Sequence, residues 1–235
     1  MHPFRTISSR PHTVRLRGAL LAVALLFAGG ALAGPPLLCH PFQTAGAPSL
    51  PWGKGWNDLH RGYDVSSLTR DTRALLGMQV PVIARMETLR RAAIYASGNG
   101  TVARQLAAQL EARVVATKDG NAKDGKVKAL ALFDAGYFAE TLQDIARLQG
   151  YDMPGVGTVD MTAVNAILAK GDGSNRIAQA IALRPDDPAL RFAAALVSSA
   201  DERKADYNIH ARLARNGARS DRLLALNIRH VASSD

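Results

Sequence analysis

The sequence predicts an all-α fold of stacked antiparallel helical hairpins, about nine helices in all, preceded by an extended strap. From residue 65 onward, apolar residues recur every three or four positions, which is the spacing of one helix face. β-branched residues never gather into the bounded alternating runs that mark strands. Short loops with glycine or proline separate the helical stretches, as is typical of helices that run antiparallel to their neighbours.

Residues 1–33 have the pattern of a secretory signal peptide. Four arginines and no acidic residue precede a 16-residue apolar run over 18–33, which ends in the cleavage pattern Ala31-Leu32-Ala33. The run is shorter than a typical transmembrane helix. We therefore expect cleavage after Ala33, no membrane span in the mature chain, and a periplasmic or secreted protein. An uncleaved signal anchor is the alternative.

Residues 34–63 form the predicted strap. This segment holds five of the eleven prolines, and proline removes backbone donors and opposes helix formation. It is too apolar for a free linker, because it also contains Leu37, Leu38, Phe42, Leu50, Trp52 and Trp56. We expect the strap to cross the helical body with its aromatic residues as anchors. A strap that orders only when a partner binds is the alternative.

The helical domain covers residues 64–235. Three helices are expected before residue 118: one capped by Asp64, Ser66 or Ser67, one that starts at Pro81, and one that Thr101 caps. A polar loop over 118–125 leads into two helices over 127–148, which a Gly136-Tyr137 joint divides. Five further helical stripes follow, over 164–168, 177–183, 190–197, 205–214 and 223–231.

Two passages have the composition of helical hairpins. One is ALALFDAGYFAETLQDIARL at 129–148, and the other is AIALRPDDPALRFAAALV at 180–197, where Pro188 begins a helix that Asp186 and Asp187 can cap. Both resemble tetratricopeptide-type repeats, whose helix pairs use alanines at close contacts and end in proline-bearing turns. No 34-residue period runs through the chain, so the resemblance implies an architecture of stacked hairpins and no specific activity.

The composition excludes several classes of protein. With 47% hydrophobic and 21% charged residues, the chain is too apolar to be disordered, and its single cysteine excludes a disulfide-rich scaffold. The formal charge of +9 over 235 residues falls to +5 without the signal arginines, because 25 basic and 20 acidic residues remain. No sequence motif for zinc, phosphate or serine-hydrolase chemistry is present.

Two constellations are candidates for chemistry. Asp134, Glu140 and Asp144 offer carboxylates for general acid–base catalysis by an envelope enzyme, although such a helix face is more often simply solvated. Cys39, His40 and His60 of the strap offer a thiolate and two imidazoles for Zn(II) or Cu, or for a small ligand. Their spacing is not diagnostic, and a buried free thiol or a disulfide between two copies are the other roles for Cys39. We expect no cofactor.

Surface residues are the candidates for binding. Tyr95, Tyr137 and Phe138 are aromatic anchors for a partner in the groove of the helical stack, unless they belong to the core. The basic C-terminal segment, with Arg212, Arg215, Arg219 and Arg222, suits an anionic lipid or glycan of the cell envelope, and we expect no nucleic acid partner. The sequence therefore favours an exported scaffold that binds another macromolecule over an enzyme.

Overall fold

The computed structural model describes residues 35–118, 125–148, 153 and 155–231. Within these ranges the secondary structure is helical, with nine α-helices, two short 3-10 helices and no strand beyond isolated bridges. The prediction of an all-α fold with about nine helices is confirmed. The predicted signal peptide over 1–33 lies outside the described residues. No helix in the described part of the chain has both the length and the apolar character needed to cross a membrane.

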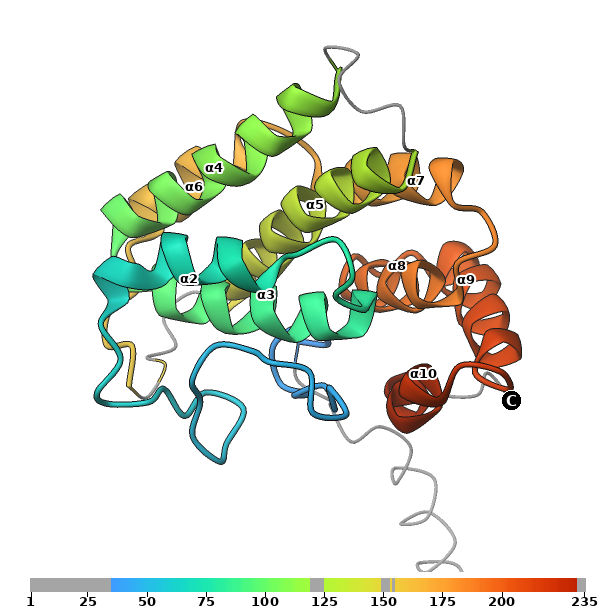
Figure 1. The fold of residues 1–235 in the computed structure, drawn as a ribbon. Coiled ribbons are helices and arrows are strands. Elements are labelled where there is room, and N and C mark those ends of the chain that lie inside the picture. The colour runs from blue at the N-terminus through green and yellow to red at the C-terminus, as the bar shows by residue number, and fades with distance from the viewer. Residues whose placement is uncertain (1–34, 119–124, 149–152, 154, 232–235) are drawn as a thin grey trace, which may run out of the picture. The chain divides into compact units, whose positions relative to one another are not determined.

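Most successive α-helices reverse direction and pack as antiparallel hairpins (Figure 1), whereas α6 and α7 do not pack on each other and α7 packs mainly on α5. In chain order they are α2 (Leu68–Leu75), α3 (Val82–Ser97), α4 (Gly100–Lys118), α5 (Gly125–Arg147), α6 (Met161–Leu168), α7 (Gly173–Leu183), α8 (Pro188–Ala200), α9 (Lys204–Gly217) and α10 (Arg222–Asn227). The 3-10 helices η1 (Val65–Ser67) and η2 (Ile228–His230) flank this series.

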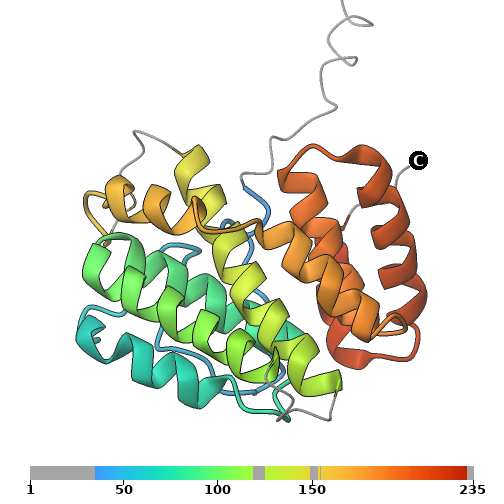
Figure 2. The same ribbon diagram turned by 90° about the horizontal axis from the view of Figure 1, so that it is seen from above.

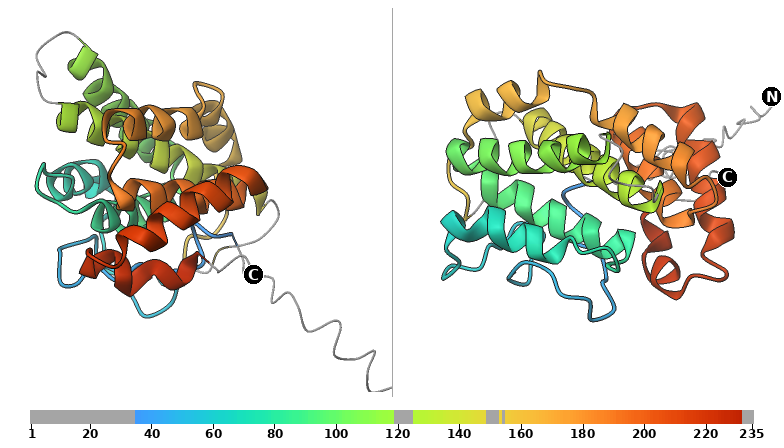
Figure 3. Two further views of the ribbon diagram at one scale, coloured as in Figure 1. Left: turned by 90° about the vertical axis from the view of Figure 1, so that its right-hand side faces the viewer. Right: turned by 45° about the horizontal axis from the view of Figure 1, so that its top comes forward.

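Alternate helices stack on one another, which produces two layers. One layer contains α3, α5 and α7, and the other contains α2, α4 and α6. Helix α5 is central, because it contacts α3, α4, α6, α7 and α8, and it runs between α4 and α7 (Figure 2). The α8/α9 hairpin and α10 gather at one end of this arrangement (Figure 3).

Helix α5 corrects the prediction of two helices over 127–148. The chain continues as one helix through Gly136, with no joint at that residue. A Cβ atom at Gly136 would lie 2.7 Å from the carbonyl oxygen of Gly173 and 3.0 Å from the Cβ of Arg176. The glycine therefore serves the close crossing of α5 and α7, where a side chain would collide with the α7 backbone.

The helix caps follow the sequence with one exception. The side chains of Asp64 and Asp187 accept backbone N–H bonds at the starts of η1 and α8, as expected. Helix α4 begins earlier than predicted, because the Oδ1 of Asn99 accepts the Val102 N–H at 3.2 Å. The expected cap at Thr101 is thus wrong, since asparagine is an equally good N-cap and lies two residues upstream.

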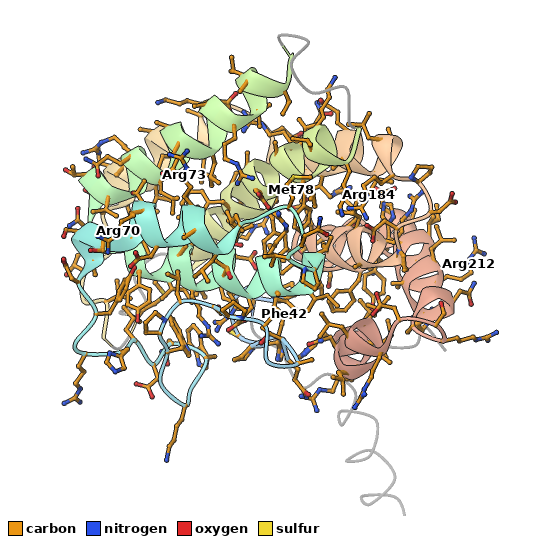
Figure 4. All side chains as sticks on the ribbon, in the orientation of Figure 1. Phe42, Arg70, Arg73, Met78, Arg184 and Arg212 are labelled. Carbon is orange, nitrogen blue, oxygen red and sulfur yellow. The ribbon has the colours of Figure 1, made fainter. Side chains whose placement is uncertain are left out.

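The strap is irregular chain that crosses the helical body below α3 in the view of Figure 1. Leu37, Leu38 and Leu50 are fully buried, and Phe42 packs edge-on against Phe192 of α8 (Figure 4). These contacts confirm the expected strap and make it part of the core.

Side chains of the helices bind the strap backbone. Asp144 accepts the Leu37 N–H at 3.1 Å, and Glu87 accepts the Phe42 N–H at 3.0 Å. The guanidinium of Arg90 donates to the carbonyl oxygens of Leu38 and Trp56, at 3.0 and 2.7 Å. We call this set of contacts the strap interface. It satisfies the buried polar groups of a segment that has no regular secondary structure of its own.

Candidate functional site

The three aromatic candidates lie in the interior. Tyr95 binds the strap, because its hydroxyl donates to the carbonyl oxygen of Pro51 at 2.7 Å and accepts the His60 N–H at 3.0 Å. Tyr137 is fully buried and stacks on Phe133. Phe138 is buried beneath a surface groove described below. Tyr95 and Tyr137 are therefore core residues rather than exposed anchors, since the apolar stripes that carry them face other helices and the strap.

The basic candidates are at the surface. Arg212, Arg219 and Arg222 are exposed and Arg215 is half-buried; Arg212 projects outward from α9 in Figure 4. Arg215 and Arg219 line an open pocket of about 530 Å³ together with Arg229. Among the described residues that line this pocket, the three arginines are the charged ones.

The carboxylates of α5 are not on a solvated face, which corrects that expectation. Asp134, Glu140 and Asp144 are all buried, because α5 is surrounded by other helices and the strap. Asp134 accepts hydrogen bonds from Arg85 at 2.7 and 2.9 Å and from Arg113 at 2.9 Å. Asp144 forms an ion pair with Arg147 at 2.8 Å. Two of the three candidate acid–base groups are thus held as ion pairs with arginine.

Glu87 is a fourth buried carboxylate, and it belongs to the strap interface. It pairs with Arg91, four residues further along α3, at 2.6 Å and with Arg90 at 2.9 Å, and the glutamate is fully buried. The pair is therefore a part of the core and not the exposed helix-surface pair that its spacing suggests.

Glu140 differs from the other buried carboxylates. It is 6% exposed, and no arginine or lysine of the described residues lies within ion-pair distance of it. The nearby Ser174 backbone N–H, in the first turn of α7, acts to lower the pKa of Glu140. Burial, followed by the nearby charge of Asp201, raises the pKa of Glu140 to about 7.

Gly173 makes this position of Glu140 possible. A Cβ atom at residue 173 would lie 2.6 Å from the Glu140 Oε1 atom and 2.6 Å from the carbonyl oxygen of Gly136. Only a glycine leaves room for the carboxylate against the first turn of α7. The same glycine pair that lets α5 and α7 cross closely therefore also places the carboxylate.

Glu140 faces a polar pocket of about 630 Å³ between α5, the loop before α7, and the turn between α8 and α9. The charged residues that line this polar pocket are Glu140, Arg147, Asp172, Asp201 and Arg203. With three acids and two arginines, its lining carries a formal charge of −1 when Glu140 is ionised.

An apolar groove of about 740 Å³ adjoins the polar pocket, and the two share Ala139 and Gly171 in their walls. The groove has α4 along one side, α5 as its floor, and the end of α6 with the start of α7 along the other side. Its floor includes Phe138, and Val115 on its rim is 45% exposed. The α4 wall is formed largely by small residues: Ala107, Ala108, Ala112 and Ala116.

Charged residues stand at the rim of the apolar groove. Glu111 of α4 and Arg176 of α7 form an ion pair of 2.7 Å, and Lys170 also lines the groove. The groove and the polar pocket together form one cleft that is apolar along most of its length and acidic at one end. Such a cleft suits a ligand with an apolar body and a cationic group.

Cys39, His40 and His60, the strap residues considered as an alternative set of metal ligands, are not brought together as a site. The part of the chain that the structure describes contains no group of three histidine, cysteine or acidic residues placed to hold a metal ion. The His40 ring lies 5.3 Å from that of His230, whereas the His60 backbone binds Tyr95. Cys39 is a half-buried free thiol, and burial raises its pKa, which disfavours the thiolate that a metal needs.

Sequence reasoning missed the cleft. The spacing of Ala108, Ala112 and Ala116 places three small residues on one side of α4, which was a usable signal for a shallow groove. The lack of a cation at Glu140 gave no sequence signal, because Arg147, seven residues away on the same helix, pairs with Asp144 and Asp201 instead. Comparison of the chain with protein-family models, with curated proteins and with solved structures gives no match.

Proposed function

We propose that this chain is an exported helical scaffold that binds another protein of the cell envelope, by holding an amphipathic helix of that partner in the apolar groove. The observation that carries the proposal is the open groove over α5, with alanines on its wall and Phe138 on its floor. The signal-peptide pattern of residues 1–33 supports export. The hairpin-like passage at 180–197 supports a scaffold of the tetratricopeptide type.

The dimensions of the groove favour a helix as the occupant. Its α4 wall extends from Ala107 to Ala116, which corresponds to about 14 Å or two and a half helical turns. Small side chains let a second helix approach closely, and an amphipathic helix would cover the exposed Val115 with its own apolar face.

A groove-filling substitution tests the proposal. Ala112→Trp places a large ring on the exposed groove wall, whereas Ala205→Trp adds the same ring at an exposed position of α9 that lines none of the pockets described above. The probe is a fluorescent helical peptide of about 14 residues with leucines along one face. We expect Ala112→Trp to weaken its binding by about tenfold or more and Ala205→Trp to leave it unchanged. Equal affinity for all three proteins, or no binding to the unsubstituted protein, would overturn the proposal.

The arginine pocket supports a second candidate function, which is contact with an anionic membrane surface. Arg219 in the turn after α9 and Arg229 in η2 line one open pocket. The exposed apolar residues Ile209 and Leu213 lie on the neighbouring α9, and Leu226 lies on α10. Basic and apolar side chains together suit a lipid interface. The test is sedimentation with vesicles that contain about one-third phosphatidylglycerol.

The matched control for that test is at the opposite end of the fold. We expect Arg219→Glu combined with Arg229→Glu to abolish vesicle binding. Arg70→Glu combined with Arg73→Glu changes the net charge by the same amount on α2, far from Arg212 in Figure 4, and is expected to have a smaller effect. An equal loss in both double variants would show that net charge and not the arginine pocket is responsible.

A further inference from the structure

We infer that the polar pocket is a recognition site for a lysine or arginine side chain carried by the helix that binds in the apolar groove, with Glu140 as its counter-charge. This inference rests on the proposed function and deepens it, because it assigns a chemical specificity to the same cleft. Three independent observations support it: the missing cation at Glu140, the state of the other charges in the pocket, and the continuity of the pocket with the groove.

Glu140 lacks what every other buried carboxylate of the described chain has. Glu87, Asp134 and Asp144 each bind at least one arginine, at distances between 2.6 and 2.9 Å. An ionised carboxylate that is removed from water without a cation is unfavourable, so folding alone gives no reason to keep one at residue 140. An incoming ammonium or guanidinium group would supply the missing partner.

The other charges around Glu140 are already satisfied within the chain. Arg147 of α5 pairs with Asp144 at 2.8 Å and also with Asp201 at the end of α8. Arg203 pairs with Asp201 at 3.0 Å and with Asp206 at 2.7 Å. Asp172 caps α7 through the Asn175 N–H at 3.1 Å. Glu140 is therefore the one buried carboxylate in the described lining of the polar pocket that has no arginine partner.

The pocket and the groove are placed for one ligand. Ala139 is the residue before Glu140 and lies in the walls of both hollows, as does Gly171 across from it. A helix seated over Phe138 and Ala139 would have one edge directed at the polar pocket. The long apolar stem of a lysine or arginine can lie across Ala139 while its charged end reaches the carboxylate.

Two peptides that differ by one charge test the inference. The first is a helical peptide of about 14 residues with leucines along one face and a lysine at their edge; the second has norleucine in place of that lysine. Norleucine keeps the stem and removes the ammonium group. At pH 8 we expect the lysine peptide to bind the unsubstituted protein about tenfold or more tightly than the norleucine peptide.

Substitutions in the protein localise the effect. Glu140→Gln keeps the shape of the side chain and removes its charge. The ratio of lysine-peptide to norleucine-peptide affinity should then fall to about one, with the affinity for the norleucine peptide unchanged. Glu202→Gln removes one charge from an exposed residue of the neighbouring α8–α9 turn and should keep the full preference. Circular dichroism of both variants is the control for correct folding.

The pH dependence gives a second readout. Four other charged residues face Glu140 in the polar pocket: Arg147 of α5, Asp172 at the start of α7, Asp201 after α8 and Arg203 before α9. Arg147, Asp201 and Arg203 are held in ion pairs, and Asp172 caps α7. Since Glu140 takes up a proton near pH 7 in the free protein, the preference for lysine should decline as the pH falls from 8 to 6. The Glu140→Gln variant should show no such decline.

The outcomes separate the inference from the proposed function. If both peptides bind equally well and Ala112→Trp weakens both, the groove is a helix site and the inference about Glu140 is wrong. If neither peptide binds at about 1 mM, the proposed function and the inference are both overturned. A preference for lysine that survives Glu140→Gln would place the counter-charge elsewhere and also contradict the inference.

Discussion

The strap interface and the polar pocket treat a buried glutamate in opposite ways. At the strap interface, Glu87 binds Arg90 and Arg91 and also accepts the Phe42 N–H, so its charge is matched on every side. In the polar pocket, Glu140 is 6% exposed, and no arginine or lysine of the described residues forms an ion pair with it. Both regions bury a glutamate, but only the glutamate of the strap interface forms ion pairs with arginines.

This difference indicates what each region is for. A carboxylate that is fully matched by arginines fixes the position of the groups around it, and here those groups are the strap and α3. A buried carboxylate without a cation destabilises the folded state while it is ionised. A fold that retains such a group at the edge of an open groove has a reason outside its own stability, and recognition of a cation is the reason that the geometry supports.

The largest expected effect is the loss of the matched charge at the strap interface. Glu87→Gln leaves Arg90 fully buried without a counter-charge, although Arg90 keeps its bonds to the Leu38 and Trp56 carbonyl oxygens. Breaking a buried ion pair from one side costs about 3–5 kcal/mol, and we expect a loss of that size in the free energy of unfolding by urea. A loss below about 1 kcal/mol would show that the strap interface does not depend on this pair.

The next largest effect is an increase in stability, which we expect for Glu140→Gln. Glu140 has a pKa of about 7 in the folded protein against 4.5 for the free side chain, so the folded state binds the proton more tightly. The stability conferred by protonated Glu140 is therefore fully present below pH 4.5 and is lost as the pH rises through about 7. Glu140→Gln removes this dependence, because glutamine stays neutral.

The measurement is a series of urea unfolding curves between pH 5 and pH 8. We expect Glu140→Gln to be about 2–3 kcal/mol more stable than the unsubstituted protein at pH 8, with the difference closing toward pH 5. The Glu87→Gln and Glu140→Gln variants make the same chemical change in the two regions. If both destabilise the protein at pH 8, the distinction between the regions is wrong.

The local signals of the fold were readable in the sequence. The helical periodicity, the aspartate caps before η1 and α8, and the apolar residues of the proline-rich strap all reflect contacts within a few residues or simple burial. Gly136 was misread, because a glycine in a helix indicates a break unless a second helix crosses there. The crossing partner, Gly173, is 37 residues away, and no local pattern shows that approach.

The candidate site was only partly predictable, because contacts between residues far apart in the chain leave no local pattern in the sequence. The sequence placed Glu140 among three candidate carboxylates but treated them alike. What separates them is which arginine reaches which carboxylate: Arg85 meets Asp134 across 49 residues, and Arg147 lies one turn from Asp144. The Arg85–Asp134 pair depends on the stacking of α3 on α5, so which of the three carboxylates lacks an arginine emerges only from the assembled helices.

A smaller effect is expected at the edge of the strap interface. Tyr95→Phe removes the hydrogen bonds to Pro51 and from His60 but keeps the ring, which packs edge-on against Trp52 at a centroid distance of 5.4 Å. We expect a loss of about 1–2 kcal/mol, because the His60 N–H and the Pro51 carbonyl lose a partner without losing apolar contact. Hydrogen exchange provides the test: the His60 amide should exchange faster, whereas amides in the middle of α5 should not. Unchanged exchange at His60 would show that Tyr95 does not hold this part of the strap.

The smallest effect tests whether an ion pair between an arginine and a carboxylate stabilises this protein only where the pair is buried. Arg70 and Asp71 of α2 form an ion pair of 2.9 Å, which is a distance like that of Arg90 and Glu87, but the Arg70 side chain is 77% exposed. Water and salt already solvate both groups, so the pair adds little to the stability of the fold. We expect Arg70→Ala to leave the midpoint of urea unfolding unchanged within error, in low and in high salt. A loss as large as that of Glu87→Gln would mean that arginine pairing stabilises this protein regardless of burial, and the missing cation at Glu140 would then no longer distinguish the polar pocket from the surface.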